Sequence, residues 1–151
     1  MYLKKVTESI LKERYKPIDN KISDLLSSFE NTYIEDNSSI SLQEDLKDEY
    51  KGSGGKASSS ALKIYLNYNV TQNSIEDLEI ASGNKSDSKF TGNIIPILKK
   101  NDLVLRDLGF FKIDKLKAIA KKEAYYISRY FLSTTLYVEN KQVDLLKFLN
   151  S

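Results

Sequence analysis

The chain contains no cysteine and no histidine among its 151 residues. Without cysteine there can be no disulfide framework and no thiolate metal site, which fits a reducing cytosol. Without histidine there can also be no Ser-His or Cys-His nucleophile pair and no usual imidazole zinc site. Any metal site must therefore use oxygen ligands, and these suit Mg²⁺ or Mn²⁺.

Long apolar runs and a strong charge imbalance are also missing. No segment reaches the ~20 apolar residues of a membrane-spanning helix, and the charged N-terminal segment lacks the apolar stretch of a signal peptide. We therefore expect a soluble, intracellular protein with no membrane partner. Lys and Arg number 23 against 21 Asp and Glu, a net charge of only +2. A nucleic-acid surface would have to come from local segregation of charge.

The hydrophobic content of 40% is enough to build one core, so the composition is that of a single ordinary domain. Residues 1–30 carry apolar positions at helical spacing, in two short stretches separated by Pro17. We interpret them as an N-terminal helical segment. Packing on the main domain explains their apolar stripe without a DNA-binding role.

Residues 31–151 alternate between strand and helix signals. Extended segments are predicted at residues 32–42, 62–68, 75–80, 103–105 and 124–130, and helices at residues 86–100 and 113–120. The second and third extended segments are separated by a turn-forming stretch, which predicts a hairpin. Because the later strands alternate with helices, the order favours an α/β domain with a mixed sheet and helices packed on it.

A stretch rich in glycine, serine and lysine at residues 46–61 is predicted to be a flexible loop. Its Gly-Gly-Lys sequence is not a phosphate-binding P-loop. That motif requires a glycine where Tyr50 stands and a serine or threonine where Ala57 stands.

Two aspartates occupy positions where a metal site could form. Asp36 lies in the first extended segment, and Asp107 ends the short apolar run at residues 103–105. If these strands are neighbours and parallel, both carboxylates reach the same edge of the sheet, as two-metal phosphodiester chemistry requires for ions ~4 Å apart. Taken alone, each aspartate also has a structural explanation, Asp36 as a turn residue and Asp107 as a strand terminator bonded to nearby backbone.

Four stretches resemble the catalytic domain of bacterial DDE insertion-sequence transposases: IEDNSSISL, LKDEYKGSGG, ALKIYLNYNV and DLVLRDLGFFKIDKLKAIAKKEAYYISRY. In that family the first catalytic aspartate lies in an Asp-x-Ser/Thr segment before a Lys-Gly-Ser-Gly loop. The second ends a strand that is followed by Gly-Tyr/Phe-Phe. The resemblance runs from about Thr32 to the C-terminus, is most specific around Asp107, and assigns these roles to Asp36 and Asp107.

The resemblance implies an RNase-H-like fold over residues 31–151, with a five-stranded mixed sheet and flanking helices, incomplete toward its C-terminal end. It implies Mg²⁺- or Mn²⁺-dependent cleavage and joining of DNA ends, with Asp36 and Asp107 as metal ligands, in a cytoplasmic, nucleoid-associated bacterial protein. The family's third carboxylate lies in a Tyr-x2-Arg-x3-Glu-x6-Lys signature that this chain lacks. Glu123 and Glu139 have no such context.

The missing signature leads us to expect the front portion of a transposase, inactive alone. Its expected partners are transposon-end DNA and a second copy of itself or a full-length transposase. A competing hypothesis is a non-enzymatic product that binds transposon ends or inhibits a full-length transposase. A third is an unrelated α/β binding module whose aspartates are structural.

Several basic residues follow Asp107 and are candidate DNA contacts, namely Lys112, Lys115, Lys117, Lys121, Lys122 and Arg129. A solvated helix face explains the lysines equally well. Arg129 has two open roles, a DNA contact or an ion pair with a local carboxylate. Asp87 is a candidate helix cap with no catalytic role.

Overall fold

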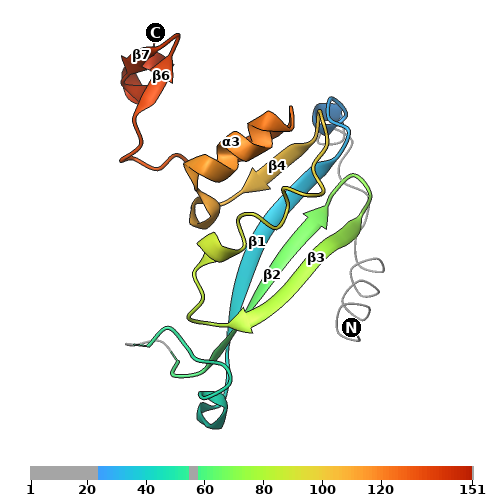
Figure 1. The fold of residues 1–151 in the computed structure, drawn as a ribbon, viewed down its shortest axis with the longest axis vertical. Coiled ribbons are helices and arrows are strands. Elements are labelled where there is room, and N and C mark those ends of the chain that lie inside the picture. The colour runs from blue at the N-terminus through green and yellow to red at the C-terminus, as the bar shows by residue number, and fades with distance from the viewer. Residues whose placement is uncertain (1–23, 55–57, 151) are drawn as a thin grey trace.

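The computed structural model describes residues 24–54 and 58–150. Most of the helical segment predicted at residues 1–30 therefore lies outside the described part, and residues 24–26 of it are helical. Five strands form one mixed sheet in the order β3-β2-β1-β4-β5 (Figure 1). Their bounds are Thr32–Ser41 (β1), Ala61–Asn69 (β2), Ser74–Ser82 (β3), Leu103–Arg106 (β4) and Tyr125–Ser128 (β5). β1 is antiparallel to β2 and parallel to β4, and β4 is parallel to β5. This is the predicted α/β architecture with an RNase-H-like sheet.

The hairpin of β2 and β3 forms where the sequence predicts it. Its strands pair antiparallel from Leu62 opposite Ser82 to Asn69 opposite Ser74, with a bulge at Asn67 and Tyr68. Asn73 ends the turn with a positive φ of 53°, a conformation that asparagine tolerates better than most residues. The long hairpin gives β1 a stable antiparallel neighbour along its whole length.

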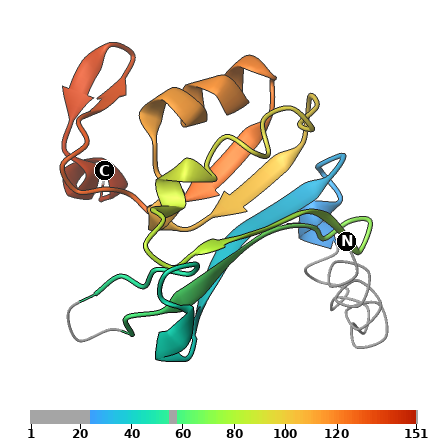
Figure 2. The same cartoon turned by 60° about the horizontal axis from the view of Figure 1, so that its bottom comes forward.

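One face of the sheet carries the core. The helix α3, Ile113–Lys121, packs there and buries Leu116 and Ile119. The main cluster combines them with residues from β1, β4, the connection before β4 and the position before β5, namely Tyr33, Val104, Ile94, Leu98 and Ala124. A second cluster unites Tyr65, Phe90 and Phe110. α3 and the connecting segments lie on the same side of the sheet (Figure 2).

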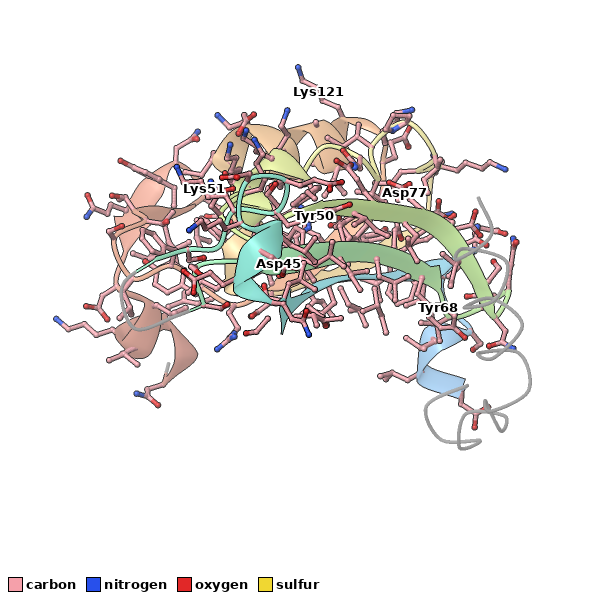
Figure 3. The ribbon with its side chains drawn as sticks, turned by 90° about the horizontal axis from the view of Figure 1, so that it is seen from below. Asp45, Tyr50, Lys51, Tyr68, Asp77 and Lys121 are labelled. Atoms are coloured by element: carbon pink, nitrogen blue, oxygen red, sulfur yellow. The ribbon has the colours of Figure 1, made fainter. Side chains whose placement is uncertain are left out.

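The opposite face of the sheet also presents apolar side chains. Strand pairing aligns Ile34 of β1, Leu105 of β4 and Ile127 of β5 in one row across it. Ile34 is 38% exposed and Ile127 is 62% exposed. Figure 3 views the sheet edge-on, with Lys121 of α3 above it and Tyr68, the register partner of Ile34, below it. The described residues therefore leave this row partly exposed, although Leu103 and Tyr68 on the same face are buried.

The helix predicted at residues 86–100 is wrong. This segment contains a short 3-10 helix, η2 at Asp87–Lys89, followed by consecutive turns. Its backbone bonds run from residue i to residue i−3, as from Asn93 N–H to the Phe90 carbonyl. Gly92 and Pro96 disfavour a regular α-helix, because glycine costs entropy and proline has no N–H to donate. The apolar spacing still places Phe90, Ile94 and Leu98 in the core.

The loop predicted at residues 46–61 is partly ordered. It follows the 3-10 helix η1, Glu44–Leu46, and its arms are joined by a bridge between Lys51 and Ser60. Gly52 donates its N–H to the Ser59 carbonyl at 2.9 Å. A Cβ at this position would lie 2.0 Å from the Ser58 carbonyl oxygen, so only glycine allows the two arms to approach this closely.

After β5 the chain forms a separate two-stranded hairpin, β6 at Leu136–Val138 and β7 at Lys141–Val143, and then the short helix α4 at Leu145–Leu149. The hairpin and helix lie beside the main sheet (Figure 1). Asp144 caps α4 by accepting a hydrogen bond from Lys147 N–H at 3.0 Å. Among the described residues, no helix is both long enough and apolar enough to cross a membrane.

The unequal burial of apolar side chains in the described sheet leads to a prediction about stability. Ile119→Ala should lower the free energy of unfolding by about 2–5 kcal/mol, because this fully buried side chain leaves a cavity in the main cluster. Ile127→Ala, on the exposed strand β5, should change it by about 0.5 kcal/mol or less. Urea unfolding followed by circular dichroism measures both. Equal losses would show that α3 does not form the main core.

Candidate active site

The two candidate aspartates lie on neighbouring parallel strands. β1 and β4 pair from Thr32 opposite Leu103 to Glu35 opposite Arg106. The pairing ends there, because Asp107 lies outside β4 and begins the next turn. Continued by one residue, the same register would bring Asp36 beside Asp107, at the spacing of about 4.8 Å between adjacent strands. The predicted parallel adjacency of the two strands is confirmed.

Asp36 is an exposed residue inside β1, with Leu66 of β2 as its antiparallel neighbour. Side chains alternate between the faces of a strand, so Asp36 points to the opposite face from the buried Glu35. The structural explanation considered for Asp36, a turn residue, is wrong because β1 continues without a turn from Thr32 to Ser41. An exposed acid inside a central strand is available to a ligand.

Asp107 directly follows β4 and begins the 3-10 helix η3, Leu108–Phe110. Its Oδ1 accepts a hydrogen bond from Leu108 N–H at 2.7 Å and another from Arg129 Nε at 2.5 Å. The Arg129 hydrogen bond and then the Leu108 N–H hold the pKa of the Asp107 carboxyl below its ordinary value. Asp107 therefore both terminates the strand and presents a stable negative charge at the sheet edge.

Arg129 reaches this edge from the residue after β5. It forms an ion pair with Asp107, which is the second of the two roles considered for it. Both side chains remain at least half exposed, at 72% for Arg129 and 50% for Asp107. The pair is therefore open to solvent and worth little stability.

Directly behind the aspartates lies a buried charged cluster that the sequence analysis missed. Glu35 and Arg106, the residues before Asp36 and Asp107, form an ion pair with both side chains fully buried. The Tyr65 hydroxyl donates to Glu35 Oε1 at 3.0 Å. Burial raises the pKa of the Glu35 carboxyl, against the opposing effects of Arg106 and Tyr65. The sequence signal for this cluster was one glutamate and one arginine within two predicted core strands, at positions that the strand pairing sets opposite each other.

The candidate lysines occupy α3 and its flanks. Lys112 and Lys115 are half-buried, whereas Lys117, Lys121 and Lys122 are exposed. Lys115 Nζ lies 3.5 Å from Asp114 Oδ2. α3 packs on the face of the sheet that carries Glu35 and Arg106, whereas Asp36 is on the opposite face. The lysines of α3 and its flanks therefore begin on the other side of the sheet from Asp36. Their DNA-binding role stays a prediction.

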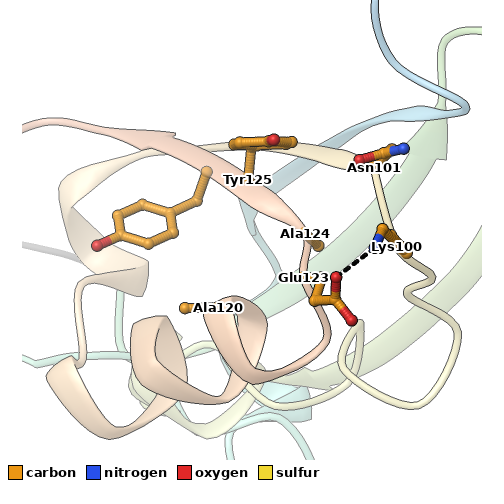
Figure 4. Close-up of a pocket in the computed structure, with 7 residues that line it drawn as sticks. Lys100, Asn101, Ala120, Glu123, Ala124 and Tyr125 are labelled. Atoms are coloured by element: carbon orange, nitrogen blue, oxygen red, sulfur yellow. Dashed lines mark hydrogen bonds and ion pairs between the residues drawn. The ribbon is translucent and has the colours of Figure 1, made fainter.

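Among residues 24–54 and 58–150, no three acidic side chains gather into a group that could hold a metal ion. Glu123 borders a pocket with Lys100, Asn101 and Tyr125 (Figure 4), and its carboxylate pairs with Lys100. This pocket lies where β5 begins, at the other end of the strands from Asp107. Glu139 has a φ of 49° in the turn between β6 and β7.

Asp87 is not the cap of η2. The cap is Ser86, whose hydroxyl accepts a hydrogen bond from Ser88 N–H. Asp87 instead pairs with Lys63 of β2 at 2.6 Å. Its carboxylate lies so close to Gly109 that a larger residue at position 109 would clash with it. Asp87 thus neutralises the ammonium group of the buried Lys63, which also donates to the Lys85 carbonyl at 2.7 Å.

Comparison with known proteins identifies the family of the chain. Residues 27–149 match the family model of the transposase DDE domain. The chain belongs to the DDE transposase family. The insertion-sequence transposase of IS1151 from Clostridium perfringens is 32% identical over 146 residues, which are 97% of this chain and 31% of that protein. The IS231F transposase of Bacillus thuringiensis subsp. israelensis is 30% identical over 147 residues, again 97% of this chain and 31% of the relative.

The chain thus spans about a third of the length of these relatives. The residues that match the family model include the whole described sheet, from β1 to β5, and the hairpin and helix that follow it.

The ion pair of Asp107 makes a prediction about pKa. Arg129→Gln should raise the pKa of Asp107 toward its ordinary value, because the largest contribution that favours the carboxylate is removed and only the Leu108 N–H remains. Carboxyl carbon chemical shifts followed by NMR during an acid titration measure this change.

Lys100→Gln is the matched control, since it breaks an exposed ion pair at the opposite end of the sheet. It should leave the titration of Asp107 unchanged. A midpoint for Asp107 that stays the same in Arg129→Gln would contradict the ion pair as the cause.

Proposed function

We propose that this chain supplies two metal-ligand aspartates, Asp36 and Asp107, to the active site of an insertion-sequence transposase. The observation that carries the proposal is the parallel pairing of β1 with β4, whose last pair, Glu35 opposite Arg106, lies one residue before the two aspartates. Asp36 and Asp107 are exposed, whereas Glu35 and Arg106 are buried. The resemblance of the segments around these aspartates to the DDE transposase family, to which the chain belongs, supports the same two positions.

The donor set fits Mg²⁺ or Mn²⁺. Carboxylate oxygens are the hard ligands these ions prefer, and the chain has no imidazole or thiolate to favour zinc. When bound, such ions supply charge stabilisation to an in-line phosphoryl transfer on DNA. Asp107, kept ionised by its hydrogen bonds, is ready to bind a cation without first losing a proton.

Arg129 has a second role in this proposal. A cation at Asp107 would compete with the guanidinium for Oδ1, and the exposed Arg129 side chain is free to turn toward solvent. A guanidinium released at this edge is suited to a DNA phosphate, since it offers paired N–H donors. Lys112, Lys115 and Lys122 would add sequence-independent attraction to the DNA backbone.

The 151-residue chain by itself is proposed to lack strand-cleavage activity. Only two acids meet at the candidate edge among the described residues, and Glu123 lies at the opposite end of the strands. Holding two ions at a fixed separation needs further ligands. A chain that keeps the fold and the DNA-facing groups but lacks chemistry could also bind transposon ends, or pair with a full-length transposase and inhibit it.

Metal binding tests the two aspartates. Mn²⁺ should bind with a dissociation constant on the order of a millimolar, because two carboxylates supply few ligands. Asp107→Asn should weaken this binding severalfold or more, whereas Asp114→Asn, a solvent-facing acid of α3, should not. Isothermal titration calorimetry compares the three. Equal affinity in the unaltered chain and Asp107→Asn would remove Asp107 from the site.

Activity on DNA tests the second part of the proposal. The purified chain, incubated with labelled insertion-sequence ends and excess Mn²⁺, should give no nicking or joining, since loss of positioning alone costs about a hundredfold in rate. Gel analysis of the labelled ends is the measurement. Nicking that disappears in Asp36→Ala would show that another acid completes the site.

A further inference from the structure

We infer that the buried pair of Glu35 and Arg106 is a positioning device for Asp36 and Asp107. The inference rests on the proposed function, because it concerns the same two aspartates. Each member of the pair immediately precedes one of them in the sequence, and the two members are register partners across β1 and β4. The ion pair therefore joins the two strands one residue before the candidate site.

The cost of this pair argues against a purely stabilising role. Both side chains are fully buried, and Arg106 Nε has no hydrogen-bond partner in the described structure. Burying two charges is about as costly as their attraction is favourable, so apolar residues of similar volume would serve stability equally well. What a buried ion pair does supply is a specific register, since only one pairing of the strands brings the charges together.

Two further contacts hold the pair in place. Tyr65 of β2 donates its hydroxyl to Glu35, and Arg106 Nη1 donates to the Phe110 carbonyl of η3 at 3.5 Å. Tyr65 and Phe110 in turn pack against each other, with ring centroids 6.0 Å apart. The arginine thereby also links β4 to η3, the turn that Asp107 begins. Both the strand register and the exit of the chain after Asp107 depend on it.

A one-residue slip between β1 and β4 would separate the carboxylates and turn one of them to the other face. The pair opposes such a slip, because the slip would separate the two buried charges and leave each without its opposite charge. Glu35 and Arg106 are thus positioning residues that touch neither metal nor DNA.

Disulfide trapping tests the inference without any metal. The chain has no cysteine, so Asp36→Cys/Asp107→Cys introduces the only two thiols. A disulfide forms when the Cα atoms are about 4.4–6.8 Å apart, and a β1–β4 register continued by one residue would place the two positions within this range. The rate of thiol loss in a glutathione redox buffer then reports how firmly these two positions are held together.

The test background is Glu35→Leu/Arg106→Met, which keeps the core apolar and of similar volume. The matched control is Asn31→Leu/Asp102→Leu. It removes a polar link between the residues that precede the same two strands, where Asn31 Nδ2 donates to Asp102 Oδ1 at 2.9 Å. We expect trapping to slow in the test background, because the two positions are then held together less firmly and reach disulfide geometry less often. The control should trap at the unaltered rate.

Trapping at the unaltered rate in a folded Glu35→Leu/Arg106→Met chain, or equal slowing in the control, would overturn the inference. If the test background fails to fold, Tyr65→Phe replaces it, because it removes only the hydroxyl donated to Glu35. It should slow trapping in the same direction, and an unchanged rate would count against the inference.

Mn²⁺ titration of Glu35→Leu/Arg106→Met, with the aspartates intact, is the second measurement. Its affinity should fall about tenfold, whereas the Asn31→Leu/Asp102→Leu control should keep its affinity. If Mn²⁺ binds equally to the unaltered chain and to Asp107→Asn, the proposed metal site fails. The trapping rates still decide whether the pair fixes the two positions.

Discussion

The parallel pairing of β1 with β4 is the contact on which both the core and the candidate site depend. On one face it brings Tyr33 beside Val104, against which the helix α3 packs. Its last pair, Glu35 opposite Arg106, comes one residue before the two candidate aspartates, Asp36 and Asp107. Four residue pairs thus hold the centre of the sheet. Because β4 is short, its register depends largely on its side chains and on the turn that follows it.

Much of this fold could be predicted from local pattern. Alternating apolar residues predicted the hairpin, the apolar run at residues 103–105 predicted the central strand β4, and helical spacing predicted α3. The helix predicted at residues 86–100 was wrong because 3-10 turns place the same apolar residues in the core. The spacing of apolar residues alone does not distinguish such turns from an α-helix. The aspartate positions followed from family resemblance, and the strand pairing that joins them from the order of elements.

The buried ion pair could not have been predicted in the same way. Glu35 and Arg106 are 71 positions apart, and each alone resembles an ordinary charged residue. Only the register of two non-consecutive strands brings them together, and that register is a tertiary property. Once formed, the pair is hard to break one side at a time, because removing a single partner of a buried ion pair costs about 3–5 kcal/mol. Substitutions at these positions should therefore be tolerated only when both change together.

The apolar residues that the described part of the chain leaves exposed on the sheet have a consequence for handling the protein in solution. Strand β5 lies at the edge of the described sheet, and Tyr125, Tyr126 and Ile127 are all more than 40% exposed on it. An edge strand with unpaired backbone groups and apolar side chains is a template for adding another strand. With Ile34 and Ile80 exposed on the sheet behind it, the purified chain has a surface suited to aggregation at high concentration. A lysine introduced in β5 would be a rational first step toward a soluble sample.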